Sequence, residues 1–223
     1  MKKKGLLLFS VFFMIFAFSG CEDAFKSDKN YRLSPLKENE PVPMSVDNYW
    51  VYRIESYDKT VIDTTWGDTV KVIGIENINN EEWYHFYSVA GNCDYYQTQR
   101  EDGIYRGFGD CSDDEISIHY KFPCEKGDVF ESETGLPSDH KKYVGATDTL
   151  MNIDIGKFRC IEYYYYGLGT NDDGSIYYTI KYSDYVCPGV GLILFEAHYK
   201  EETESDAEYK LSLRMELVDY RIY

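Results

Sequence analysis

Apolar and polar residues alternate strictly along several segments of this chain, and the alternation restricts what the chain can fold into. In residues 209–217, Tyr, Leu and Met occupy every odd position, whereas Lys, Ser, Arg and Glu occupy every even position. Residues 115–122 repeat the pattern, with two Ile, a Tyr and a Phe on one face. A period of two residues is that of a half-buried strand in an antiparallel sheet. The apolar set then shifts by one position, which predicts a β-bulge near Leu217–Val218.

Other segments of the chain are rich in β-branched and aromatic residues and are separated by turn signals. The further predicted strands are 48–57, 68–76, 82–89, 93–100, 104–109, 128–133, 142–153, 157–166, 176–186 and 191–200. No window of this region has an apolar stripe with the 3.6-residue period of a helix. The sequence therefore predicts an all-β fold. We expect one domain, residues 46–223, of about a dozen antiparallel strands that form a strongly curved sheet, a barrel or a sandwich.

The first twenty residues have the composition of an export signal. Three lysines follow Met1, and an apolar stretch runs from Gly5 to Phe18. This stretch is too short for a membrane-spanning helix, which needs about 20 residues. Phe18-Ser19-Gly20-Cys21 resembles the bacterial lipobox, which implies cleavage before Cys21 and a diacylglyceryl thioether on its sulfur. We therefore predict a signal peptide at residues 1–20 and lipidation of Cys21. The two or more acyl chains that this lipidation implies would hold the protein stably at a membrane.

The segment after Cys21 resembles a linker rather than part of a core. Residues 21–45 lack apolar periodicity and contain three prolines, which predicts a lipidated flexible tether. Glu22 and Asp23 are similar to the surface-export signal of Bacteroidota lipoproteins. We expect a lipid anchor in the outer membrane, on its periplasmic or its cell-surface face. The formal net charge of −16 argues against electrostatic binding to nucleic acid.

Five cysteines besides the lipidated one suit an oxidising compartment. If Glu101-Asp102-Gly103 is a three-residue hairpin loop, Arg100 pairs with Ile104, and Cys93 then lies opposite Cys111. Pairs at this position share no hydrogen bonds and have Cα atoms about 4.5 Å apart, within reach of a disulfide. The sequence therefore predicts a disulfide between Cys93 and Cys111.

The remaining cysteines and the histidines give no catalytic or metal-binding motif. Any two of Cys124, Cys160 and Cys187 could pair, and the sequence does not choose between them. The chain has no Cys-x-x-Cys pair, Gly-x-Ser-x-Gly elbow, His-Glu-x-x-His helix or phosphate loop. We expect structural or surface roles for the four histidines, which are His85, His119, His140 and His198. We expect no metal, no cofactor and no enzymatic activity.

Four consecutive tyrosines stand out in one predicted strand. Alternation places Tyr163 and Tyr165 on one face together with an isoleucine, and Tyr164 and Tyr166 on the other face together with Cys160. A tyrosine ring has an apolar face and a polar tip, which suits stacking on a sugar or packing against a partner. The alternative is that these rings fill the concave side of a curved sheet.

Five stretches of the chain, in their order and spacing, resemble a family of uncharacterised Bacteroidota lipoproteins. They are DNYWVY (47–52), REDGIYR (100–106), YKFPCEKGD (120–128), GKFRCIEY (156–163) and CPGVGLILFE (187–196). The resemblance covers most of the predicted domain, and it brings no catalytic residue. More distantly, the pattern is similar to half-barrel periplasmic lipoprotein carriers, whose curved antiparallel sheets hold acyl chains.

These features favour a membrane-anchored envelope lipoprotein with a non-catalytic binding or interaction role, for which a glycan, a protein or a lipid is the candidate ligand. The alternative is a carrier or chaperone for an apolar or lipid ligand inside the curved sheet. A hydrolase is a third class. It would need a cleft with two convergent carboxylates, or a His within reach of a Ser or Cys. The sequence leaves the oligomeric state open.

Overall fold

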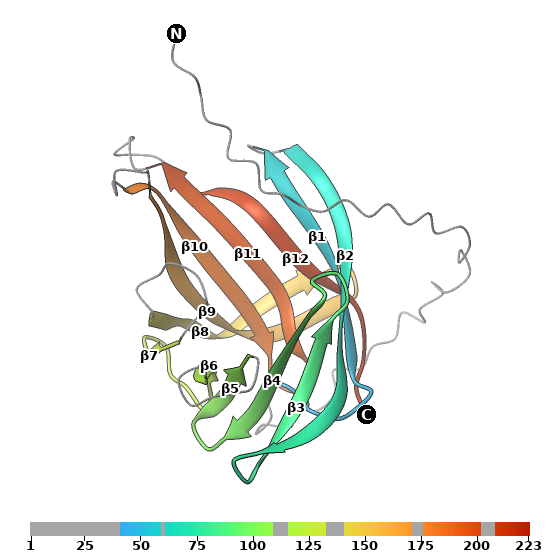
Figure 1. The fold of residues 1–223 in the computed structure, drawn as a ribbon. Coiled ribbons are helices and arrows are strands. Elements are labelled where there is room, and N and C mark those ends of the chain that lie inside the picture. The colour runs from blue at the N-terminus through green and yellow to red at the C-terminus, as the bar shows by residue number, and fades with distance from the viewer. Residues whose placement is uncertain (1–40, 59–60, 109–115, 133–140, 171–175, 202–207) are drawn as a thin grey trace, which may run out of the picture. The chain divides into compact units, whose positions relative to one another are not determined.

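The structure is a computed structural model, and it describes residues 41–58, 61–108, 116–132, 141–170, 176–201 and 208–223. The predicted signal peptide, Cys21, the tether up to residue 40, Cys111 and His140 lie outside the described residues. Within the described ranges the fold is all-β, as predicted, and no helix is present (Figure 1). Those ranges accordingly contain no helix long and apolar enough to cross a membrane.

Twelve antiparallel strands of the described residues form one sheet in the order β6-β5-β4-β3-β2-β1-β12-β11-β10-β9-β8-β7. Consecutive strands pair with each other, except that β6 and β7 are the two edges of the sheet, and the last strand pairs back with the first. The sheet curves so strongly that its two edge strands, β6 and β7, come into contact and nearly close it (Figure 1). The strands are β1 (Tyr49–Asp58), β2 (Val61–Ile78), β3 (Glu81–Ser88), β4 (Cys93–Arg100), β5 (Gly103–Gly107), β6 (Ser117–Lys121), β7 (Val129–Glu131), β8 (Lys141–Ile153), β9 (Gly156–Thr170), β10 (Ile176–Cys187), β11 (Gly191–Glu201) and β12 (Lys210–Arg221).

The bulge predicted in the last strand is confirmed. In the β1–β12 ladder, Val51 pairs with Asp219 and Tyr52 pairs with Leu217, so Val218 is the extra residue. Leu217 and Tyr220 therefore both belong to the core, although they are three positions apart. The change of phase in the sequence reports this change of strand geometry directly.

The first half of β2 was not predicted. Residues 61–67 extend the strand beyond the predicted start at residue 68, and all seven side chains are exposed. These residues still pair with β1 along most of its length. A strand segment that buries neither face is under no pressure to alternate apolar with polar residues, so its sequence carries no period of two.

The predicted register of the β4–β5 hairpin is wrong by one residue. Arg100 pairs with Gly103 and Gln99 pairs with Ile104, so the loop has two residues rather than three. Gly103 is the first residue of β5, with φ of +154°. A Cβ atom there would lie 2.2 Å from the carbonyl oxygen of Tyr120. Glycine is therefore required by the close approach of β6 to the hairpin, and not by a third loop position.

Residues 41–45, which the sequence analysis assigned to the tether, pack against the domain. Val42 is 7% exposed and belongs to one of the two core clusters. Asn48 Nδ2 donates to the carbonyl oxygen of Pro43 at 3.0 Å, and the backbone N–H of Tyr223 donates to Asn48 Oδ1 at 2.9 Å. The buried Asn48 thus ties this segment to the end of the chain. The domain begins before residue 46.

The contact at Gly103 generates a prediction about stability. We expect Gly103→Ala to lower the free energy of unfolding by about 3 kcal/mol, because the new methyl group overlaps a carbonyl oxygen at an unfavourable φ. Denaturant unfolding followed by tryptophan fluorescence measures the change. Gly74→Ala is the matched control, since a Cβ atom at Gly74 has open space around it. Equal stability of the two variants would contradict this account of the hairpin.

Candidate functional site

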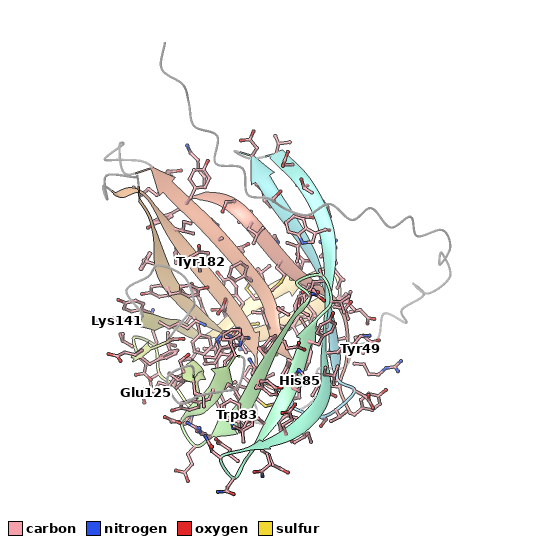
Figure 2. All side chains as sticks on the ribbon, viewed as in Figure 1. Tyr49, Trp83, His85, Glu125, Lys141 and Tyr182 are labelled. Atoms are coloured by element: carbon pink, nitrogen blue, oxygen red, sulfur yellow. The ribbon has the colours of Figure 1, made fainter. Side chains whose placement is uncertain are left out.

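The concave face of the sheet encloses a partly open cavity of about 390 Å³. This volume falls in the range of roughly 300–1,000 Å³ that is typical of small-molecule sites. Most of its lining is apolar; every strand except β7 and β8 contributes a residue, and β10 contributes only Asp184. Figure 2 shows side chains packed densely where β3–β6 and β8–β9 lie and more sparsely along the far ends of β10–β12, β1 and β2.

Strand register places an apolar band across four strands of this face. Ile54 lies between Trp66 on β2 and Met215 on β12, and Met215 in turn pairs with Phe195 on β11. Cross-strand partners on one face lie about 5 Å apart, so the four side chains form a continuous strip. All four line the cavity. Trp66 is 41% exposed, so its ring is accessible from solvent.

Two tyrosines continue the apolar band onto β9 and β10. The ring of Tyr182 stacks on Phe195 with 6.0 Å between centroids and on Tyr165 with 4.8 Å between centroids. Figure 2 labels Tyr182 on β10. Burial raises the pKa of both tyrosines, so the hydroxyls stay neutral at physiological pH.

The inner end of the cavity is formed by aromatic rings whose polar atoms are already satisfied. Trp50 Nε1 donates to the carbonyl oxygen of Val190 at 2.6 Å, and the Tyr52 hydroxyl donates to that of Leu192 at 3.1 Å. Phe86 stacks on Trp50 with 6.0 Å between centroids. These bonds fix the rings and leave apolar ring surface toward the cavity.

A buried ion pair supports the polar side of the cavity. Lys142 Nζ lies 2.7 Å from Asp184 Oδ2, and the two side chains are 1% and 7% exposed. The ammonium also donates to the carbonyl oxygen of His119 at 3.1 Å and lies 4.4 Å from the ring centroid of Tyr120. Burial lowers the pKa of Lys142, and the charge of Asp184 opposes that shift. Asp184 lines the cavity, but its charge is compensated by this lysine.

Arg106 is the second cation at the cavity, and its partners in the described part of the chain are neutral. With the amide of Gln97 oriented to satisfy both groups, the Gln97 oxygen accepts from Arg106 Nη2 at 3.0 Å and Nε at 3.2 Å. The guanidinium carbon lies 4.4 Å from the ring centroid of Tyr95. Among the described residues, no carboxylate lies within ion-pair distance of Arg106. The positive charge is therefore held by neutral groups.

The cavity holds a second carboxylate, which is also engaged. Asp68 accepts a hydrogen bond from the Ser88 hydroxyl at 2.7 Å and from the backbone N–H of Ala90 at 2.8 Å. Asp184 is occupied by the buried lysine. Both carboxylates thus have structural partners, and neither is paired with a histidine in the described part of the chain.

His119 lines the cavity, whereas the sequence had suggested only a structural or surface role for it. Burial, with smaller contributions from Arg106 and Lys142, holds its pKa well below the usual value, so the ring is neutral at pH 7. No Ser or Cys side chain of the described residues is hydrogen-bonded to this ring. In the same residues, no group of three or more His, Cys, Asp or Glu is arranged to hold a metal ion.

The tyrosine run is divided between the two faces of β9, as alternation predicts. Tyr163 and Tyr165 are buried, at 0% and 8% exposed, while Tyr164 and Tyr166 are partly exposed. Cys160, which alternation places on the same face as Tyr164 and Tyr166, is instead fully buried. The β8–β9 register is irregular at this point, so the strand changes face just after Cys160. Only Tyr165 of the run lines the cavity.

The cysteines are placed differently from the sequence expectation. Cys93 is exposed and carries a free thiol, and Cys111 lies outside the described residues, so their disulfide stays a prediction. The hairpin register that suggested it is the one found to be wrong by one residue. Cys160 and Cys187 are both buried, and each raises or lowers the pKa of the other's thiol: that of Cys160 is raised and that of Cys187 is lowered. Cys124 Sγ lies 3.7 Å from a tyrosine hydroxyl oxygen.

Comparison with known proteins adds little to this site. No protein-family model and no curated protein matches the chain. A protein described as exported, with a YmcC-like fold, from Bacteroides fragilis NCTC 9343 has a TM-score of 0.48 and 11% identity over 82% of this chain and 99% of its own. A protein described as a lipoprotein, from Parabacteroides distasonis ATCC 8503, has a TM-score of 0.47 and 11% identity with the same coverage. Likeness at this level carries no argument, so the resemblance to Bacteroidota lipoproteins stays an expectation from the sequence.

The buried ion pair yields a prediction about stability. We expect Lys142→Met to lower the free energy of unfolding by about 3–5 kcal/mol, because it leaves the Asp184 carboxylate buried and unpaired. Adding Asp184→Leu to that variant removes the orphaned charge and recovers most of the loss. Arg159→Met is the control, since its ion pair with Asp148 is exposed and contributes at most about 1 kcal/mol. If the double variant Lys142→Met/Asp184→Leu is no more stable than Lys142→Met, this interpretation is wrong.

Proposed function

We propose that this domain is a non-catalytic binding module that holds an elongated apolar ligand in the hollow of its sheet, and that Cys21 anchors it to the outer membrane. The cavity carries the proposal: it is partly open, and it is lined by a continuous apolar band. Well-packed interiors leave few voids larger than a water molecule. A hollow of about 390 Å³ with apolar walls is therefore suited to a ligand rather than to packing.

This proposal favours the carrier alternative over binding by rings exposed on the outside of the sheet. The outer rings of Tyr143, Tyr164 and Tyr166 contact one another, with centroids 5.1–6.4 Å apart, and Lys181 Nζ lies 4.9 Å from the Tyr164 centroid. Their faces are thus partly used within the cluster. The rings lining the hollow have satisfied polar tips and face open space.

A non-catalytic role agrees with how the polar groups of the cavity are bonded. Asp68 and Asp184 both have structural partners, and Ser88 donates its hydroxyl proton to a carboxylate. Hydrolysis needs a nucleophile, or an activated water, within reach of a free base. His119 lines the cavity and is a candidate base, but no nucleophilic side chain of the described residues is hydrogen-bonded to it.

Photo-crosslinking in membranes tests the proposal with the full chain. We expect a diazirine-bearing dodecanol to label residues of the concave face, such as Ile54, Trp66 and Phe195. Leu213→Trp fills the cavity with a larger ring and should reduce labelling of these positions roughly tenfold, equivalent to about 1.4 kcal/mol. Peptide mass spectrometry measures the labelled sites.

Leu150→Trp is the matched control for this experiment. Leu150 is 62% exposed on β8 and does not line the cavity, so the same substitution there should leave labelling unchanged. Labelling that spreads over exposed apolar side chains and is indifferent to Leu213→Trp would refute the binding proposal.

A further inference from the structure

The cavity combines an apolar band with a guanidinium that makes no ion pair within the described residues, and this combination narrows the class of ligand. The guanidinium belongs to Arg106, which lines the cavity. A buried or half-buried charge is expensive unless an opposite charge or hydrogen bonds compensate for it. Lys142 has Asp184, whereas the partners of Arg106 in the described part of the chain are an amide oxygen and a ring face.

The hydrogen bonds of Arg106 leave one edge of its guanidinium unused. A guanidinium has five N–H donors in a planar fork. Gln97 accepts from Nε and Nη2, which together form one edge. The opposite edge, formed by Nη1 and the second N–H of Nη2, has no partner among the described residues. That edge matches a carboxylate, which accepts two parallel N–H bonds.

The positive charge of Arg106 affects the pKa of several side chains on the polar side of the cavity. Burial raises the pKa of Tyr52, Tyr95 and Tyr120, and the guanidinium opposes the shift in each case. It also contributes to the lowered pKa of His119. These groups surround Arg106 and stay neutral, so they do not compete for it as anions. Asp68 is already bonded to Ser88 and Ala90.

We infer that the ligand is a single-chain amphiphile with a carboxylate head, bound by the free edge of Arg106 while its apolar chain lies along the band from Phe195 to Trp66. This inference rests on the proposed function and names the ligand class. Asp68 also lines the cavity and repels anions, so a singly charged carboxylate fits the free edge of Arg106 better than a phosphate monoester, which carries nearly two charges. Trp66 is exposed at one end of the band, where a chain longer than the cavity would emerge.

A matched pair of photoprobes tests this inference in the full chain at pH 7.5. The probes are a diazirine-bearing dodecanoate and the corresponding dodecanol, which differ only in the head group. We expect wild-type protein to prefer the acid by roughly tenfold, the factor for a charge-assisted pair worth about 1.4 kcal/mol. Arg106→Met should abolish that preference, and Arg106→Lys should keep part of it, because an ammonium retains the charge but not the fork.

Arg100→Met is the control variant. Arg100 also lies over a tyrosine ring, with 4.2 Å to the Tyr105 centroid, but it is paired with Glu81 and does not line the cavity. Because each variant is compared through its acid-to-alcohol ratio, partitioning of the probes into the membrane cancels. Labelling by the alcohol also shows that each variant is folded. If Arg106→Met is labelled by neither probe, Arg106→Lys provides the test. A reduced preference for the acid in that variant supports the inference, and an unchanged preference contradicts it.

The two proposals fail in different ways. Cavity labelling by both probes with no preference in the wild type would overturn the carboxylate inference and leave the binding function standing. A preference that survives Arg106→Met would also overturn it. The absence of cavity labelling by either probe would remove the binding function itself.

A separate observation concerns two buried thiols at the junction of β9 and β10. Ile161 pairs with Val186, so the next positions along the two antiparallel strands, Cys160 and Cys187, are opposite each other. Both residues are buried, at 0% and 5% exposed, and each shifts the pKa of the other's thiol. Directly opposite residues of an antiparallel pair have Cα atoms about 4.5–5.5 Å apart, which is within the range of disulfides.

We propose that Cys160 and Cys187 form a disulfide when the exported chain meets a disulfide-bearing oxidant such as a thiol–disulfide oxidase. Either cysteine can supply the first thiolate, for instance Cys187. Its thiolate attacks the oxidant's disulfide and releases one thiolate; Cys160 then attacks the mixed disulfide and releases the second. Two electrons and two protons pass to the oxidant. Because both sulfurs are buried, the exchange precedes closure of the sheet.

Alkylation and peptide mapping test the disulfide. We expect full-length protein from its native envelope, alkylated after denaturation without reductant, to yield a linked Cys160–Cys187 peptide that dithiothreitol separates. Cys124 should be recovered alkylated, since its sulfur contacts a hydroxyl and not a thiol. Recovery of Cys160 and Cys187 in alkylated form, or a link from either to Cys124, would overturn the proposal.

Discussion

The ladder between β1 and β12 is the interaction on which the rest of the structure depends. It joins the first and last strands of a chain whose other pairings are all between neighbours in sequence. Without it the twelve strands would form two separate runs, β1 to β6 and β7 to β12. With it they form one sheet long enough to curve back on itself, so that one face is enclosed. The apolar band of the cavity crosses this junction, through Ile54 and Met215.

The sequence predicts the strands well because most of them bury one face only. All twelve predicted strands exist, and the bulge at Val218 follows from the shift in phase. The predictions fail where the burial of a strand does not follow the alternation of apolar and polar residues in its sequence. The exposed first half of β2 has no alternation to detect, and Cys160 lies where β9 changes face. At Gly103 the sequence signals a turn, but the constraint is the approach of β6, a contact between distant residues.

The candidate site was harder to predict, although its polar residues do leave a signal. Arg106 lies two positions after the buried Ile104, and Lys142 lies two positions before the buried Val144. Each charged residue is therefore on the same strand face as a buried apolar residue. A charged residue in phase with a buried apolar set is therefore a sign of an interior charge. The sequence does not predict which carboxylate, if any, such a charged residue pairs with. Lys142 meets Asp184 only because β8, β9 and β10 curve around the interior, whereas no carboxylate of the described residues lies within ion-pair distance of Arg106.

A hollow in the interior and a cation without an ion pair among the described residues both reduce the stability of a fold, so their presence together is informative. Filling the cavity with larger side chains would add dispersion contacts, and exchanging Arg106 for an apolar residue would remove the need to solvate a charge. The neighbouring Lys142 shows that this interior can supply a carboxylate to a buried cation. Among the described residues Arg106 has no such partner, while the rings of Trp50 and Tyr52 have their own polar atoms satisfied. The two features complement each other in one ligand, since a chain that fills the hollow can carry a carboxylate at its end.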